Sequence, residues 1–147
     1  MADTSEPKYA GFWLRLGASL IDIVVLLAII APIELAFFGR DYIALAAAGK
    51  TLSVDLWTQI VLPLLAMILL WRYRSATPGL MVLSAKIVDA KTLAPATVGK
   101  LTLRAVVLLV MWLLFLPLIG VLWIAFDRRK QGWHDKAAGT LVIRAAD

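Results

Sequence analysis

Long apolar runs are the feature that most constrains how this chain folds. Of its 147 residues, 62% are hydrophobic, whereas a typical soluble domain is about 45–50% apolar. A helix needs about 20 apolar residues to cross the roughly 30 Å hydrocarbon core of a bilayer. We therefore predict an all-α integral membrane protein with membrane-spanning segments over about residues 10–38, 54–73 and 101–126.

The first apolar run is longer than the core of a signal peptide and lacks a small-residue cleavage site. We expect it to be retained as the first membrane helix, with a polar tail over residues 1–8 in front of it. Residues 9–147 then form a single membrane domain. Its loop at residues 39–55 has mixed charge, and Ser53 or Asp55 is a candidate N-cap for the second helix.

The third apolar run is interrupted by Pro117 and Gly120, which allows two topologies. As a helical hairpin it returns the C-terminus to the cytoplasm, whereas as a single span it places the C-terminus outside. The hairpin leaves only Arg40 and Lys50 of the 15 Lys and Arg residues outside, so 13 (15 minus 2) lie inside or near the inner interface. Since Lys and Arg concentrate on the cytoplasmic side, we favour the hairpin, with a cytoplasmic N-terminus in a bacterial inner membrane.

Two segments are then predicted to be cytoplasmic, residues 74–100 and 127–147. Each contains a candidate strand, "LMVLSAKIV" at residues 80–88 and "GTLVIR" at residues 139–144. Alternation and β-branched residues favour strands here. We expect the two to pair in a small cytoplasmic β element.

The first span carries two charges, Arg15 and Asp22. Seven residues are close to two helical turns, so both side chains lie on one face, about 10 Å apart along the helix axis. Charges inside a membrane usually face protein or water and often mark function. Two readings follow: a polar pair that fixes helix packing, or an ion or proton site.

Several classes of site have no support in the sequence. The chain has no cysteine and one histidine, His134, which argues against a metal site, and no catalytic or cofactor-binding motif is present. We expect neither an enzyme nor a cofactor. Nor do we expect nucleic-acid binding, because the basic residues flank apolar runs. The expected partners are the lipid bilayer, anionic lipids in particular, and a second copy or another membrane protein.

Three segments together resemble the RDD family of small membrane proteins, named for one arginine and two aspartates. They are "GFWLRLGASLID", "TPGLMVLSAKIVD" and "DRRKQGWHDKAAGTLVI". The family often has a lysine after TPG, where this chain has Leu80. The resemblance implies that the arginine is Arg15 and that the aspartates are Asp22 and Asp135. Asp127 and His134 are possible additional members of the site.

The resemblance sharpens one hypothesis, that Arg15, Asp22 and Asp135 converge at the inner membrane interface. The five donors of a guanidinium group can bridge two carboxylates. Such a cluster suits a membrane module or accessory subunit, which is the function we favour. The alternative is a proton or sodium transport component working as an oligomer, since transport has been suggested for the family.

Overall fold

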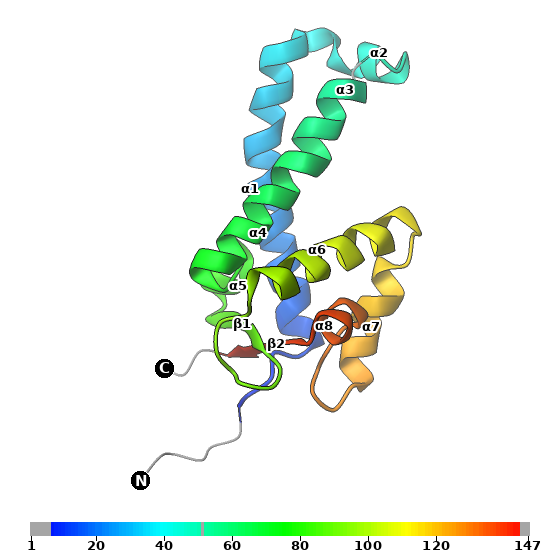
Figure 1. Ribbon diagram of the computed structural model, residues 1–147. Helices are drawn as coiled ribbons and strands as arrows, with labels where there is room; N and C mark the ends of the chain where they lie inside the picture. The colour runs from blue at the N-terminus through cyan, green and yellow to red at the C-terminus, as the bar shows by residue number, and fades with distance from the viewer. Residues whose placement is uncertain (1–6, 51, 145–147) are drawn as a thin grey trace.

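The computed structural model describes residues 7–50 and 52–144. Two long helical stretches lie side by side in it (Figure 1). The first is α1 (Phe12–Phe38), and the second runs through α3 (Leu52–Asp55), a π-helical segment η2 (Leu56–Val61) and α4 (Leu62–Arg74). Both are long and apolar enough to cross a membrane. Most of the predicted polar tail, residues 1–6, lies outside the described residues.

Part of the chain between these two stretches, residues 39–47, is helical, although a loop was predicted there. It forms a short 3₁₀ turn, η1 (Gly39–Asp41), and α2 (Tyr42–Ala47). The sequence of α2, "YIALAA", is rich in good helix formers. The N-cap prediction was also wrong, because the helical run already includes Leu52 and continues through Ser53 and Asp55.

The first half of the predicted strand at residues 80–88 is also helical. It belongs to α5 (Pro78–Val82), where Thr77 is the N-cap and its hydroxyl accepts a hydrogen bond from the Leu80 N–H at 3.3 Å. Proline is favoured at the first position of a helix because it has no N–H to satisfy. Local capping therefore outweighs the alternating pattern, and the strand begins only after Ser84, which has a φ of 50°.

The β element itself is confirmed. β1 (Ala85–Asp89) pairs with β2 (Thr140–Arg144) in an antiparallel ladder in which Ile87 faces Val142. The chain just before α1 joins the same sheet, since the Ala10 N–H donates to the Val142 carbonyl at 2.9 Å. Three segments far apart in the sequence therefore meet below the long helices, and we call this region the sheet end (Figure 1).

The third apolar run folds as two helices, α6 (Val98–Leu113) and α7 (Pro117–Phe126). The predicted break near Pro117 is confirmed, and it lies at residues 114–116, where Phe115 has a φ of 55°. Pro117 starts α7, and Gly120 lies inside α7 against the Met111 side chain. In Figure 1, α6 leaves the sheet end at a steep angle to α1, and α7 folds back toward it.

A compact core lies where the sheet end meets α1, α4 and α6. Its most buried members include Ile87, Leu101 and Val142, all no more than 1% exposed. Above the sheet end, many large apolar side chains of the long helices are exposed, such as Val24 at 66% and Leu65 at 54%. An apolar surface of this kind is typical of contact with lipid.

Candidate functional site

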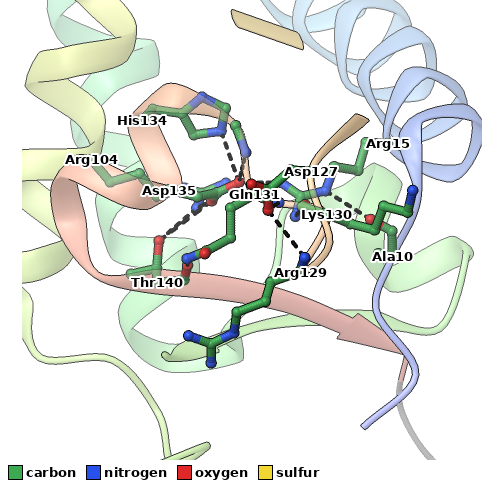
Figure 2. A network of polar contacts seen from close by, with 11 residues as sticks. Ala10, Arg15, Arg104, Asp127, Arg129, Lys130, Gln131, His134, Asp135 and Thr140 are labelled. Carbon is green, nitrogen blue, oxygen red and sulfur yellow. Dashed lines mark hydrogen bonds and ion pairs between the residues drawn. The ribbon is translucent and has the colours of Figure 1, made fainter. Parts of the chain in front are cut away.

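Asp135 is the centre of a buried polar cluster at the sheet end (Figure 2). It lies in the first turn of α8 (Trp133–Ala138), where its carboxylate accepts a hydrogen bond from the Gly132 N–H at 2.9 Å. Acidic residues are favoured in the first turn of a helix, because the free N–H groups there carry partial positive charge. The side chain is 0% exposed, so its negative charge depends on partners within the protein.

Two arginines supply the opposite charge. Arg15 of α1 and Arg104 of α6 reach Asp135 from opposite sides, each forming an ion pair with a different carboxylate oxygen (Figure 2). Arg104 also donates to the Thr140 hydroxyl at 2.9 Å. Arg15 donates to the carbonyls of Ala10 at 3.1 Å and Lys130 at 2.6 Å.

We call Arg15, Arg104 and Asp135 the charge cluster. It joins α1, α6 and α8, three elements that are distant in the sequence. Removing buried charges from water is costly, and their mutual attraction offsets that cost only when the remaining donors and acceptors are also satisfied. Here backbone carbonyls, Thr140 and Gly132 satisfy most of them.

His134 lies beside this cluster, with Nε2 3.5 Å from an Asp135 oxygen. The carboxylate is already shared by two guanidinium ions, so the imidazole does not gain a full counter-charge from it. Burial and the nearby positive charges of Arg104 and Arg15 hold the pKa of His134 well below 6.5. The histidine is therefore neutral at physiological pH.

Asp22 does not share a hydrogen bond with the charge cluster. Its two carboxylate oxygens accept from the Thr77 hydroxyl at 2.6 Å and from the Gly79 N–H at 2.7 Å. It thus joins α1 to the start of α5, the segment that carries the TPG motif. The structure brings Arg15 and Asp135 together, as predicted, whereas Asp22 forms hydrogen bonds to two other partners, Thr77 and Gly79.

Asp127 organises the turn that leads into α8. It accepts hydrogen bonds from the N–H groups of Arg129 at 3.1 Å and Gln131 at 3.0 Å, and it forms an ion pair with Lys136. Burial alone would raise the pKa of Asp127, but the hydrogen bonds from Lys136 and Gln131 outweigh it and hold the pKa below 3.8. Its partners are local, so Asp127 shapes the turn that presents Asp135.

Comparison with known proteins agrees with this set of motifs. The sequence model of the RDD family matches residues 9–139. The chain belongs to the RDD family. It is similar to the uncharacterized membrane protein YteJ of Bacillus subtilis, with 29% identity over 97% of this chain and 85% of that protein.

A second relative of this RDD chain is the uncharacterized protein RP437 of Rickettsia prowazekii. It is 38% identical over 51% of this chain, and the match spans 40% of that relative's length. No solved structure matches. The family, the relative named as a membrane protein and the two long apolar helices together identify this RDD chain as a membrane protein.

Arg104 was not predicted from the sequence as a site residue, although it completes the cluster of this RDD protein. The signal was present, because Arg104 is the sole charged residue between Leu101 and Phe126. An isolated charge in an apolar run needs a buried partner, and the same reasoning had singled out Arg15. The identity of that partner, Asp135, depends on the tertiary fold.

A second polar network lies at the far end of the long helices. Glu34 is buried between α1 and η2, at 8% exposure. Its carboxylate accepts from the Thr58 hydroxyl at 3.2 Å and from the Gln59 amide at 2.9 Å.

Within the part of the chain that the structure describes, no three His, Cys, Asp or Glu side chains are placed to hold a metal ion.

Proposed function

We propose that this RDD protein is a non-catalytic membrane module, acting as an accessory subunit or anchor in the bacterial inner membrane. The observation that carries the proposal is that its ionisable family residues are engaged inside the chain. Arg15 binds Asp135, and Asp22 binds Thr77 and Gly79. These contacts fix the sheet end to α1, which is an architectural role.

The fold supports a cytoplasmic N-terminus with the third run as a hairpin. β1 precedes α6 and β2 follows α7 and α8, yet the two strands pair, so the third run starts and ends at the same sheet. An open two-stranded sheet leaves backbone polar groups unpaired at its edges, and these are satisfied in water and not in hydrocarbon. The excess of Lys and Arg around the sheet end favours the cytoplasm as that aqueous side.

The proposed partners are the bilayer and either a second copy or another membrane protein. Exposed apolar side chains cover the faces of α1 and α6 that turn away from the core, such as Leu20 at 57% and Val110 at 45% exposure. Small residues at one helix surface let another helix approach closely, and Ser19 lies exposed next to Leu20. A module of this kind acts by assembly.

Reconstitution into liposomes tests the proposal. Purified wild-type protein is expected to carry no sodium or proton flux above that of empty liposomes, and Asp22→Asn is expected to act only through stability. Asparagine is close to aspartate in shape but bears no charge. A robust sodium- or proton-coupled flux from the wild type, lost in a well-folded Asp22→Asn variant, overturns the module proposal.

The second candidate is a proton or sodium transport component that works as an oligomer. One observation favours it: Glu34 is a buried carboxylate held by Thr58 and Gln59 beside the π-helical segment η2. Both π-helical turns and intramembrane carboxylates occur often at functional sites. If this candidate is correct, Glu34→Gln abolishes flux while Asp41→Asn, a charge change on the exposed turn η1, leaves it unchanged.

A further inference from the structure

We propose that the cavity between α1 and the α6–α7 pair binds an anionic phospholipid of the bilayer. The headgroup lies beside Arg104, and an acyl chain lies along α7. The cavity has a volume of about 600 Å³, within the range of about 300–1,000 Å³ that is usual for ligand sites. This inference goes beyond the proposed function and does not depend on it.

Unpaired donors mark the headgroup end. Arg104 and Trp71 both line the cavity and are 5% and 3% exposed, and the Arg104 Nε and Trp71 Nε1 atoms have no hydrogen-bond acceptor among the described residues. The Arg104 guanidinium lies over the Trp71 ring, 5.0 Å from its centroid, so the two groups are neighbours. An unsatisfied buried donor is costly, and the phosphate oxygens of a headgroup would supply acceptors.

The charge at this end is positive. Arg15 and Arg104 contribute two positive charges against the one negative charge of Asp135, and His134 is neutral. The protein therefore leaves one buried positive charge without a counter-charge in the cluster. A single negative headgroup charge would balance it.

The carboxylates nearby do not cancel this excess. Asp127 attracts Arg15, but it is itself paired with Lys136, so this pair adds no net charge beside the cluster. Asp22 also lines the cavity, but it lies seven residues from Arg15, about 10 Å along the helix axis, and its oxygens are held by Thr77 and Gly79. An anionic group is repelled from the Asp22 part of the cavity, and this orients the headgroup toward Arg104.

The rest of the cavity is apolar and suits an acyl chain. Leu108 and Met111 of α6 and Val121 and Ile124 of α7 line it. A lipid chain that moves from the bilayer into this cavity stays among apolar groups, so its transfer carries no desolvation cost of polar groups.

The rim of the cavity explains why the ligand comes from the bilayer. Trp112, Phe115 and Ile23 line the cavity and are 64%, 91% and 48% exposed. Such large exposed apolar side chains are stable in contact with lipid and not with water. A lipid can therefore enter from the membrane with its chain first in contact with this rim.

Native mass spectrometry of the full-length protein in detergent tests the proposal with two lipids that share the same chains. Dioleoyl phosphatidylglycerol is anionic and dioleoyl phosphatidylcholine is zwitterionic. The wild type is expected to retain the anionic lipid at least about tenfold better, which is the effect of one charge-assisted hydrogen bond. Equal retention of the two lipids overturns the proposal.

Two paired variants distinguish lipid that binds in the cavity from lipid that binds to the exposed apolar surface of the protein. Val121→Phe fills the cavity and is expected to lower retention of phosphatidylglycerol about tenfold. Val106→Phe makes the same change at a position on α6 that is 45% exposed and outside the cavity, and retention is expected to stay as in the wild type. If Val121→Phe retains as much phosphatidylglycerol as Val106→Phe does, the lipid does not bind in the cavity.

Two further measurements identify the ligand chemistry. Arg104→Gln is expected to remove the preference for the anionic lipid, and if this variant does not fold, the Val121→Phe comparison still decides. Oleate tests whether a single-chain carboxylate is the true ligand. Retention of oleate without retention of phosphatidylglycerol overturns the assignment to a phospholipid.

Discussion

At the residue scale, Asp135 is expected to stabilise the fold through its ion pairs with Arg15 and Arg104. Asp135→Asn keeps the shape of the side chain but leaves Arg15 and Arg104 without a counter-charge in the protein interior. Breaking a buried ion pair in this way costs about 3–5 kcal/mol. We expect the free energy of unfolding in detergent to fall by that amount, as measured by chemical denaturation.

The matched control is the ion pair between Asp127 and Lys136, where the lysine side chain is 43% exposed. Exposed pairs contribute about 0–1 kcal/mol, so Lys136→Met should change stability little. If Lys136→Met lowers the free energy of unfolding as much as Asp135→Asn does, burial does not determine how much an ion pair stabilises this protein.

Double-mutant cycles give a second prediction for the same residues. Arg15 and Asp135 form an ion pair, so losses from Arg15→Met and Asp135→Asn should be less than additive by at least about 1 kcal/mol. Arg15 and Asp22 share no hydrogen bond among the described residues. Their losses should add within about 0.5 kcal/mol. Strong coupling between Arg15 and Asp22 would restore the three-residue convergence.

His134 predicts how stability depends on pH. Its pKa in the folded protein is well below the ordinary value of 6.5, because of burial and the nearby Arg104 and Arg15. As the pH falls below 6.5, the unfolded chain binds a proton that the folded chain does not, so stability decreases with falling pH. Asp127, with a pKa below 3.8, loses its contribution only at more acidic pH.

Stability measured between pH 8 and pH 5, roughly the range in which histidine titrates, tests this assignment. His134 is the one histidine of the chain, so the slope near pH 6 should disappear in His134→Gln. The slope of stability against pH is compared between the wild type and the variant, because the substitution itself also changes stability at every pH. A slope of equal size in His134→Gln would assign it to another group.

At the scale of elements, helices and strands that depend on local sequence were predicted correctly. Those that depend on tertiary contacts were not. The strand at residues 140–144 and the helix over residues 12–38 follow from their own patterns. The alternating stretch after Pro78 was predicted as a strand but begins as α5. There the carboxylate of Asp22, 57 residues earlier in the chain than Gly79, accepts the Gly79 N–H.

The contact between α5 and α1 also yields a prediction. A methyl group added at Gly79 would overlap the backbone of Ala18 in α1, which cannot yield as a flexible side chain would. Overpacking of this kind costs about 1–3 kcal/mol or more. We expect Gly79→Ala to lower the melting temperature in detergent clearly.

Gly17→Ala is the matched control, since an added methyl group there meets only the Leu83 side chain at 3.5 Å, an ordinary contact. Alanine also favours helix over glycine by about 1 kcal/mol, so Gly17→Ala should be neutral or stabilising. A neutral Gly79→Ala would show that α5 does not approach α1 as closely as the structure has it.

At the scale of the whole molecule, pairing between distant segments decides how the helices are arranged about the membrane. Charge bias in the sequence favoured a hairpin for the third apolar run but left a single span open. The β1–β2 ladder brings Lys86 and Arg144, which flank the run, to one sheet. This pairing could not be predicted from the run itself, because it depends on residues 85–89 and 140–144 finding each other.

Single-cysteine labelling tests the resulting topology, and the natural absence of cysteine makes each reporter unambiguous. The reporters are Lys50→Cys, Lys86→Cys and Arg128→Cys. These exposed positions lie between α2 and α3, in β1 and after α7, respectively. In intact cells, a membrane-impermeant thiol reagent should label only the cysteine at Lys50, whereas permeabilised cells should label all three. Lys86 is the reference for Arg128, since a hairpin keeps both on one side of the membrane and a single span separates them. Labelling at Arg128 in intact cells, with Lys86 still protected, would show that the third run crosses the membrane once and that the β1–β2 pairing does not form in the membrane.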